Sequence, residues 1–143
     1  MFKDIMVVFD ETPLAPKALR TAIDVAQHYD ATLHVAHVNE VGASLKSHAL
    51  ESDSLTEMLE EGSERIVDLA EDILKEYDVK YTSHVIEGSN VSRALVAFAK
   101  KENMDLLVVA SRGLGFVRQV MGSVSHSILE EAPMPVLVVK GEE

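Results

Sequence analysis

The most informative stretch of this chain is Leu106-Leu107-Val108-Val109-Ala110-Ser111-Arg112-Gly113-Leu114-Gly115, followed further on by Gly122-Ser123-Val124-Ser125. Its apolar start predicts a buried strand, its glycines a loop, and its serines the beginning of a helix over residues 124–131. Where a strand, a glycine loop and a helix start meet, backbone N–H groups can converge on an anion. Residues 111–129 carry Arg112 and Arg118 but no Asp or Glu, in a chain of formal net charge -11. This local reversal of charge predicts a phosphate site.

Four more apolar runs are predicted to be strands, over residues 5–9, 32–38, 79–86 and 136–139. Apolar residues at helical spacing separate the first four strands, over residues 14–29, 55–77 and 91–99, the second of these weakened by Gly62. The alternation predicts an α/β fold, an open five-stranded parallel sheet with helices on both faces. Ligands of such sheets bind beyond the carboxyl ends of the strands, where the winding reverses. Asp10 and the glycine loop follow two such ends.

Turn residues mark where these elements begin and end. Thr12 is predicted to cap the first helix, with Pro13 in its first turn, and Gly88-Ser89-Asn90 to cap the helix over 91–99. Residues 39–53 show no periodicity and contain Gly42, which predicts a mobile connection. No repeat or shift of composition divides the chain, so residues 1–143 are predicted to form a single domain.

Composition argues against several classes of protein. Twenty-four acidic residues against thirteen basic ones argue against a nucleic-acid partner, because binding a phosphate backbone requires a basic surface. Ten of the carboxylates lie within residues 51–76, which we interpret as a solvated helix face. The chain has no cysteine, no stretch apolar enough to cross a membrane and no signal peptide at its start. We therefore expect a cytoplasmic protein without membrane insertion.

The glycine loop does not match the common nucleotide motifs. No Gly-Lys-Ser/Thr follows its glycines, as a P-loop requires, and Arg118 stands where a dinucleotide fingerprint needs Gly. Its chemistry still suits phosphate, since Gly113 and Gly115 permit close backbone approach and the following helix start offers serine hydroxyl and N–H groups. The alternative, on spacing alone, is a glycine-containing connection with an ordinary serine cap.

The histidines do not predict a catalytic or metal centre. His34 and His37 differ by three on a strand and so point to opposite faces. His126, in the first turn of the last helix, either contacts a phosphate or lies on the surface. We predict no catalytic residue and no metal held by the protein, although a nucleotide can bring Mg²⁺ on its own phosphates. Three others are predicted to be isolated side chains, exposed or locally bonded: His28, His48 and His84.

At the glycine loop the chain resembles the universal stress protein family. The family's nucleotide loop reads Gly, two residues, Gly, nine residues, then Gly-Ser/Thr; residues 110–113 match its first half and residues 122–125 its second. This sequence departs from the pattern in two places, because Ala110 replaces the first Gly and eight residues rather than nine separate Gly113 from Gly122. The likeness continues in five further segments: Val7-Val8-Phe9-Asp10, Val35-Ala36-His37-Val38, Glu87-Gly88, Met104–Val109 and Ala132–Val139.

The resemblance implies a Rossmann-like sheet of the adenine nucleotide alpha hydrolase type, with a nucleotide across the first and fourth strands. The implied cofactor is ATP, or else AMP or ADP, in a stress-response or regulatory protein with slow or no hydrolysis. The resemblance also implies a homodimer formed by the last strand, Val136–Val139. The residues that it places around the adenine and ribose are Val8, Phe9, Asp10 and Val38. Those that it places around the ribose and phosphates are Ala110, Ser111, Arg112, Gly113, Gly122, Ser123, Val124 and Ser125.

Several alternatives stay open at this stage. Asp10 can instead serve the start of the first helix, and Arg112 and Arg118 can be ordinary surface charges. The methyl of Ala110 and the shortened loop can weaken ATP binding or favour a shorter nucleotide. They also allow a nucleotide-free dimeric scaffold that acts through protein partners, or slow ATP hydrolysis as a real activity. The charged tail 140–143 can shield the last strand from pairing.

Overall fold

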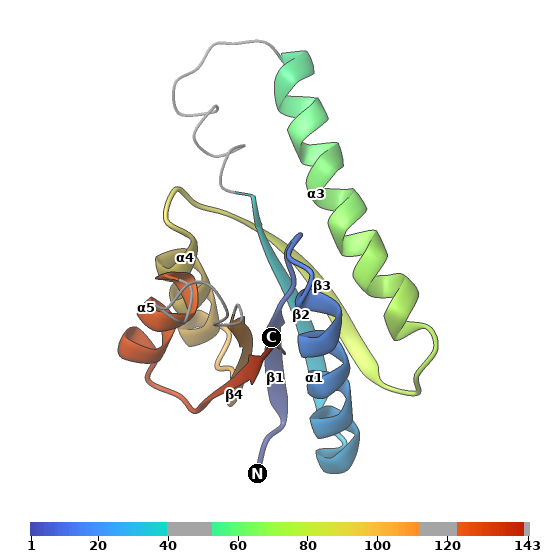
Figure 1. Ribbon diagram of the computed structural model, residues 1–143, viewed down its shortest axis with the longest axis vertical. Coiled ribbons are helices and arrows are strands. Elements are labelled where there is room, and N and C mark those ends of the chain that lie inside the picture. The colour runs from blue at the N-terminus through green and yellow to red at the C-terminus, as the bar shows by residue number, and fades with distance from the viewer. Residues whose placement is uncertain (40–52, 112–122, 142–143) are drawn as a thin grey trace.

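The computed structural model of the chain describes residues 1–39, 53–111 and 123–141, and for residues 53–60 and 123 it describes the backbone alone. Strands and helices alternate along these residues, as predicted (Figure 1). Predicted and observed ends differ by a few residues. The order and bounds are β1 (Asp4–Val8), α1 (Ala15–Tyr29), β2 (Thr32–Asn39), α3 (Asp53–Leu74), β3 (Lys80–Glu87), α4 (Val91–Lys101), β4 (Leu106–Ser111), α5 (Ser123–Glu131) and β5 (Val136–Lys140).

The five strands form one sheet in the order β3-β2-β1-β4-β5, and every pairing in it is parallel. The predicted fold class is therefore confirmed. Val7 of the central strand β1 lies opposite Val35 of β2 on one side and Val108 of β4 on the other. The winding reverses between β1 and β4, so the carboxyl ends of these two strands form the edge at which open sheets of this kind bind ligands.

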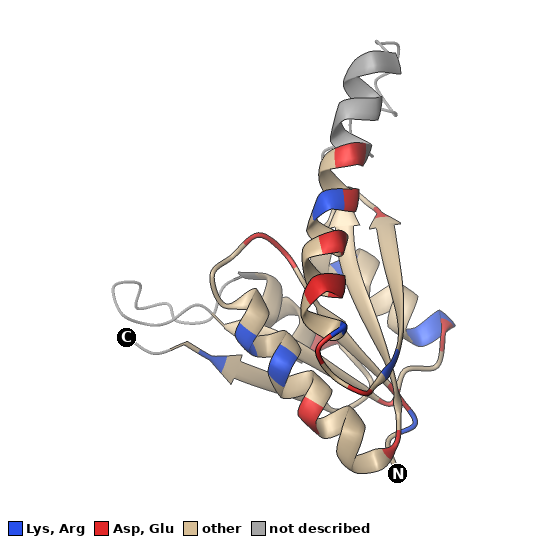
Figure 2. Cartoon of the chain, turned by 90° about the vertical axis from the view of Figure 1, so that its right-hand side faces the viewer, with Lys and Arg blue, Asp and Glu red and all other residues tan. Residues whose placement is uncertain are grey.

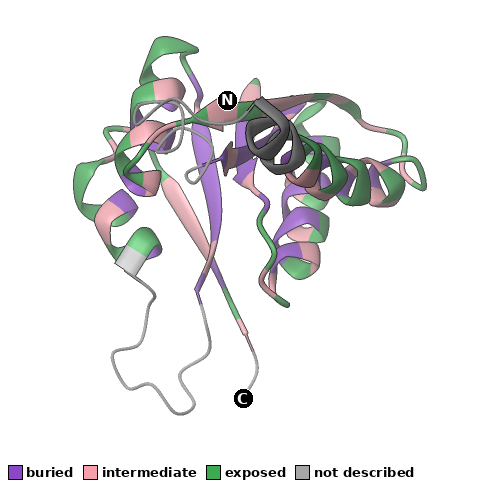
Figure 3. Cartoon of the chain, turned by 90° about the horizontal axis from the view of Figure 1, so that it is seen from above, coloured by how far each residue is buried: buried purple, intermediate pink, exposed green. Residues whose placement is uncertain are grey.

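Helices cover both faces of the sheet, with α1 and α3 on one side and α4 and α5 on the other (Figure 1). Alternate residues of the central strand pack to opposite sides: Ile5 and Val7 join the core under α1 and α3, and Met6 joins the core under α4 and α5. Burial on both faces is why the central strands are continuous apolar runs. Seen from above, buried residues concentrate along the strands and exposed ones along the outer sides of the helices (Figure 3).

The predicted caps have different outcomes. Asn90 caps α4 as expected, because its side-chain oxygen accepts a hydrogen bond of 3.0 Å from the backbone N–H of Arg93. The prediction for Thr12 is wrong: α1 begins at Ala15, and the residue at its N-cap position, Leu14, makes no side-chain cap. The hydroxyl of Thr12 instead donates to Asp10, so its hydrogen-bonding capacity is used inside the turn that precedes the helix.

Helix α3 runs from Asp53 to Leu74 without a break at Gly62. Carboxylates follow one another along its outer side (Figure 2), which agrees with the interpretation of this segment as a solvated face. The connection predicted over residues 39–53 lies outside the described residues, apart from Asn39 at the end of β2 and Asp53 at the start of α3. Among the helices that the structure describes, none combines the length and the apolar content needed to cross a membrane.

Candidate functional site

A small hollow lies at the carboxyl ends of β1 and β4, beside the start of α5. Its volume is about 50 Å³. The structure therefore brings together residues that are up to 117 positions apart in the chain, at the reversal point of the sheet. Six of the described residues line the hollow. One of them, Val109, was not expected to contact a nucleotide. The other five are among the expected contacts: Val8, Asp10, Ala110, Val124 and Ser125.

Ser125 joins two walls of this hollow. Its side chain is buried and its hydroxyl donates to the backbone oxygen of Ala110 over 3.2 Å. This bond attaches the first turn of α5 to the end of β4. The first-turn N–H groups of any α-helix lack partners within the helix, and the positive end of the helix dipole lies there. An anion seated at this end of the sheet therefore meets partial positive charge, as the sequence predicts.

Asp10 forms the opposite wall, directly after β1. Its Oδ1 accepts two hydrogen bonds, from the backbone N–H of Thr12 at 3.0 Å and from the hydroxyl of Thr12 at 2.7 Å. This turn holds the carboxylate in one orientation while the residue stays exposed. Asp10 thus fixes the turn before α1 and also lines the hollow, but it does not cap that helix, whose N-cap position is Leu14.

Phe9 and Val38 do not line this hollow. The side chain of Phe9 is buried in the core under α1 and α3, and its backbone N–H donates to the carbonyl of Ala36 over 2.9 Å. Val38 lies in β2 on the opposite face, among the residues packed against the α4 and α5 core. Both residues were expected from the family resemblance, which gives their place in the sequence but not the direction of their side chains.

A second and larger groove opens on the other side of Asp10, between the turn after β1 and helix α3. Its volume is about 650 Å³, which is within the range of small-molecule sites. Phe9, Pro13, Ile66 and Leu69 give it apolar walls, and Asp10 is the residue that lines both this groove and the small hollow. There is consequently open space on both sides of the carboxylate expected to contact the ribose.

The phosphate end of the expected site is only partly described. Arg112, Gly113 and Gly122 lie outside the described residues, as does Arg118. Ser123 is described by its backbone, as the first residue of α5. Ser111 is buried at the end of β4, opposite Lys140 of β5. Val124 is exposed at the rim of the hollow, with 36% of its surface accessible.

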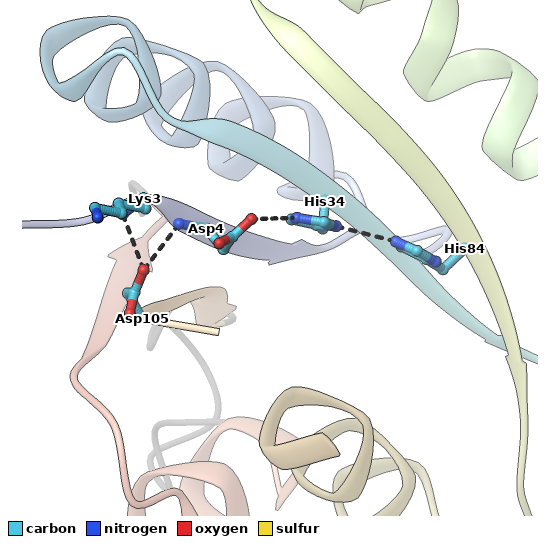
Figure 4. A network of polar contacts seen from close by, with 5 residues as sticks. All are labelled: Lys3, Asp4, His34, His84 and Asp105. Carbon is cyan, nitrogen blue, oxygen red and sulfur yellow. Dashed lines mark hydrogen bonds and ion pairs between the residues drawn. The ribbon is translucent and has the colours of Figure 1, made fainter. Parts of the chain in front are cut away.

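A polar network that sequence reasoning missed crosses the face of the sheet under α4. The Nε2 of His34 lies 3.0 Å from Oδ1 of Asp4, and its Nδ1 lies 3.1 Å from Nε2 of His84 (Figure 4). The prediction that His84 is isolated is therefore wrong. The register of β2 with β3 explains the contact, because His84 lies opposite Ala36, two residues beyond His34 and on the same face. The contact between His34 and His84 can therefore be predicted only once the pairing of β2 with β3 is known.

The start of the sheet is held by a second carboxylate, that of Asp105. Its Oδ2 accepts hydrogen bonds of 2.9 Å from the backbone N–H groups of both Asp4 and Lys3 (Figure 4). The bond from Asp4 and then that from Lys3 hold the pKa of Asp105 below its ordinary value. This side chain ties the first residues of β1 to the segment that leads into β4.

The remaining histidines have local roles. His37 is buried, with its Nδ1 3.1 Å from the backbone oxygen of Phe9, and His28 is exposed on α1. His126 lies on the surface of α5, where its Nε2 is 3.5 Å from a carboxylate oxygen of Glu130. Within the described residues, no three histidine or carboxylate side chains converge as ligands for a metal.

The fold defines the class: an open, doubly wound α/β protein whose strand order reverses between β1 and β4, beside the small hollow. The chain belongs to the universal stress protein family, whose model matches residues 1–140. A curated relative, the universal stress protein MJ0531 of Methanocaldococcus jannaschii, is 29% identical over 142 residues. That alignment covers 98% of this chain and 83% of the relative.

Solved structures of similar proteins share the fold. The hypothetical protein MJ0577 superimposes with a TM-score of 0.81 at 21% identity, covering 100% of this chain and 99% of that one. A universal stress protein solved in complex with cAMP gives a TM-score of 0.76 at 23% identity, covering 96% and 97%. The universal stress protein from Archaeoglobus fulgidus in complex with dAMP gives 0.70 at 19% identity, covering 97% and 98%.

Proposed function

We propose that this chain binds an adenine nucleotide at the carboxyl ends of β1 and β4, as a cytoplasmic stress-response or regulatory protein with slow or no hydrolysis. The observation that carries the proposal is the junction made by Ser125. Its hydroxyl attaches the positive end of α5 to the end of β4, opposite Asp10 and at the reversal of the strand order. Family members in complex with cAMP and with dAMP support the same class of ligand.

The residues present suit the parts of a nucleotide. The carboxylate of Asp10, held by Thr12, can accept hydrogen bonds from ribose hydroxyls, and Phe9 and Val38 belong to the adjoining apolar strand ends. Amide groups at the start of α5 suit phosphate oxygens. Residues 111–129 carry two arginines and no carboxylate, so this segment does not repel a polyphosphate. The remaining expected phosphate contacts are Arg112, Gly113, Gly122 and Ser123.

The nucleotide itself would supply the Mg²⁺, if any, on its phosphates. The residues of this chain then act by binding and orientation alone: amides and serines hold the phosphates, and Asp10 holds the ribose. We assign no general base and no nucleophile to the site. ATP is the first candidate, with ADP and AMP as shorter ligands that the methyl of Ala110 and the shortened loop can favour.

The proposal predicts that adenine nucleotides raise the melting temperature of the purified protein. A ligand at one hundred times its Kd stabilises a protein by about 2.7 kcal/mol, which corresponds to a rise of several degrees. Melting curves with ATP, ADP, AMP and GTP, each with Mg²⁺, measure the preference. Native mass spectrometry of the freshly purified protein reports whether a nucleotide is retained from the cell.

Two variants make this measurement specific. Gly122→Glu adds a carboxylate to the phosphate end of the proposed site and is expected to abolish the shift with ATP. Val85→Glu adds the same charge at an exposed position of β3, away from the site, and is expected to keep the shift. Equal shifts in both variants would place the nucleotide elsewhere.

A second candidate, a nucleotide-free scaffold that works through protein partners, is favoured by two observations. The hollow is small, and the hydroxyl of Ser125 is already committed to Ala110. No shift with any nucleotide and no retained nucleotide would support this scaffold and contradict the first proposal. In that case Gly113→Glu and Gly122→Glu would leave partner binding intact.

A further inference from the structure

Three neighbouring strands contribute one continuous line of polar side chains, which runs from the start of β1 to the middle of β3. Asp4 belongs to β1, His34 to β2 and His84 to β3, and all three lie on the face that α4 covers (Figure 4). The side chain of His34 is 16% exposed and that of Asp4 43%. The ring of His84 also packs against Phe98 of α4, with ring centroids 4.8 Å apart. None of these three residues lines the hollow at the ends of β1 and β4.

The two distances fix the protonation pattern of the neutral network. An ionised Asp4 carboxylate only accepts hydrogen bonds, so the Nε2 of His34 carries a proton and donates to it. A neutral imidazole has one proton, which leaves the Nδ1 of His34 as an acceptor. The Nε2 of His84 is then the donor across the 3.1 Å contact. Each of these polar atoms has a partner when both histidines are neutral.

The same geometry limits how many protons the pair can take. One added proton makes His34 an imidazolium between a carboxylate and a neutral ring, and His84 can accept from it by changing tautomer. A second added proton leaves an N–H on both sides of the 3.1 Å contact, with two positive rings in near-stacked contact. The hydrogen bond between the two rings is lost in that state, which weakens the attachment of β3 to β2.

The surroundings of His84 act in the same direction. Burial and then the neighbouring His34 lower the pKa of His84 below 6.5, and Glu102 at the C-terminal end of α4 opposes them. The folded chain therefore binds this proton less readily than the unfolded chain, so the free energy of unfolding falls as the pH drops below 6.5. Asp105 holds the backbone of Asp4. The other charged groups of α4 are exposed, namely Arg93, Lys100 and Lys101.

We propose that Asp4, His34 and His84 form an acid-sensitive latch that holds the edge strand β3 to the sheet. β3 is an edge strand with β2 as its one strand neighbour among the described residues, and the His34–His84 contact adds a side-chain bond to the eight-residue ladder between these two strands. Double protonation breaks the contact and increases opening of β3. The opened edge exposes backbone groups that can pair with another chain. The proposal is independent of nucleotide binding.

Hydrogen exchange of β3 tests the latch. Opening that exposes one imidazole of ordinary pKa, which the closed state protonates less readily, becomes more favourable by up to about tenfold between pH 7.5 and pH 5.5. We expect peptides covering Lys80–Glu87 to exchange up to about tenfold faster at pH 5.5, after correction for intrinsic exchange, while peptides from β1 change little. The range stays above the isoelectric point of about 4.9, where the protein is least soluble.

Variants separate the latch from general acid sensitivity. His84→Phe keeps an aromatic ring beside Phe98 without a titrating group and is expected to remove the pH dependence of exchange in β3. His34→Gln keeps a donor for Asp4 but leaves His84 partly buried, and is expected to reduce that dependence. His28→Gln, at an exposed histidine of α1, is the matched control and is expected to preserve it. ¹⁵N shifts of the His84 imidazole nitrogens check that its pKa lies below the ordinary value.

Three outcomes would overturn the proposal. One is exchange in β3 that is as independent of pH as exchange in β1. Another is an unchanged pH dependence in both His84→Phe and His34→Gln. The third is titration of the His84 imidazole with the ordinary pKa of 6.5. Because the spectroscopic titration uses the unaltered protein, a variant that fails to fold does not remove the test.

Discussion

The buried hydroxyl of Ser125 donates to the carbonyl of Ala110, and on the other side of the hollow Thr12 holds the carboxylate of Asp10. The first bond joins the start of α5 to the end of β4, and the second lies within the turn that follows β1. A neutral hydrogen bond contributes about 0.5–1.5 kcal/mol to stability, and an unsatisfied buried partner costs more. Single side chains therefore set the shape of this edge of the sheet.

The residue-scale prediction concerns this serine. Ser125→Ala is expected to lower the free energy of unfolding by about 0.5–1.5 kcal/mol, because the carbonyl of Ala110 loses its donor. Urea unfolding followed by circular dichroism measures the change. Ser127→Ala on the same helix is the control and is expected to cost less. Equal losses in the two variants would show that the effect belongs to α5 and not to its bond with β4.

At the scale of elements, two glycines occupy very different environments. Gly62 is inside helix α3, and a Cβ placed on it would meet no atom within 4 Å. A Cβ on Gly88, which precedes the Asn90 cap of α4, would lie 2.8 Å from the Cβ of Ala94. Gly62 therefore weakens α3 although no packing contact requires a glycine there. Gly88 allows the chain that leaves β3 to pass close to the first turn of α4.

At the element scale, we predict that replacement by alanine has opposite effects on stability at these two glycines. Gly62→Ala is expected to stabilise the protein by about 0.4–1 kcal/mol, because alanine restricts the unfolded chain and favours the helix. Gly88→Ala is expected to destabilise it, since the first turn of α4 must move to admit the methyl group. Melting temperatures of the two variants measured side by side check this. A loss of stability in Gly62→Ala would contradict this prediction and show that α3 requires a glycine at this position.

At the scale of the whole molecule, the sheet ends in two unlike edges. β3 lies at one edge and carries the proposed latch, whereas β5 lies at the other. The prediction that the last strand is an edge is confirmed. Val136 and Val138 of β5 are partly exposed on the face of α5. Exposed apolar side chains on an unpaired edge favour association with another chain.

We propose that a second copy pairs with β5, and the prediction is a particle of about twice the 15.7 kDa chain mass. Light scattering after size exclusion measures that mass. Val138→Arg is expected to give the monomer, because a charge then faces the partner. Val85→Arg, on the edge strand β3, is expected to leave the mass unchanged. A wild-type protein at the monomer mass would contradict the proposed dimer.

Local patterns were sufficient for the elements of this protein and for their parallel arrangement. A strand buried on both faces has an unbroken apolar sequence, and a helix has an apolar repeat of about 3.6 residues. The strand at Leu106–Val109 and helix α1 could therefore be predicted from the sequence. The cap at Asn90 could also be predicted, because its bond reaches only to Arg93, three residues away. The grouping of Asp10 with Ser125 followed from the rule that the ends of parallel strands meet at one edge.

Contacts between distant segments required the folded chain. The sequence does not show that the hydroxyl of Thr12 donates to Asp10, which leaves α1 without a side-chain cap. It also does not show that the ring of His84 contacts that of His34, fifty residues away. Those outcomes depend on strand register and on the direction of each side chain, and a shift of one residue would turn every side chain to the other face. The sequence therefore predicts the order and type of the elements, while packing selects which polar groups become partners.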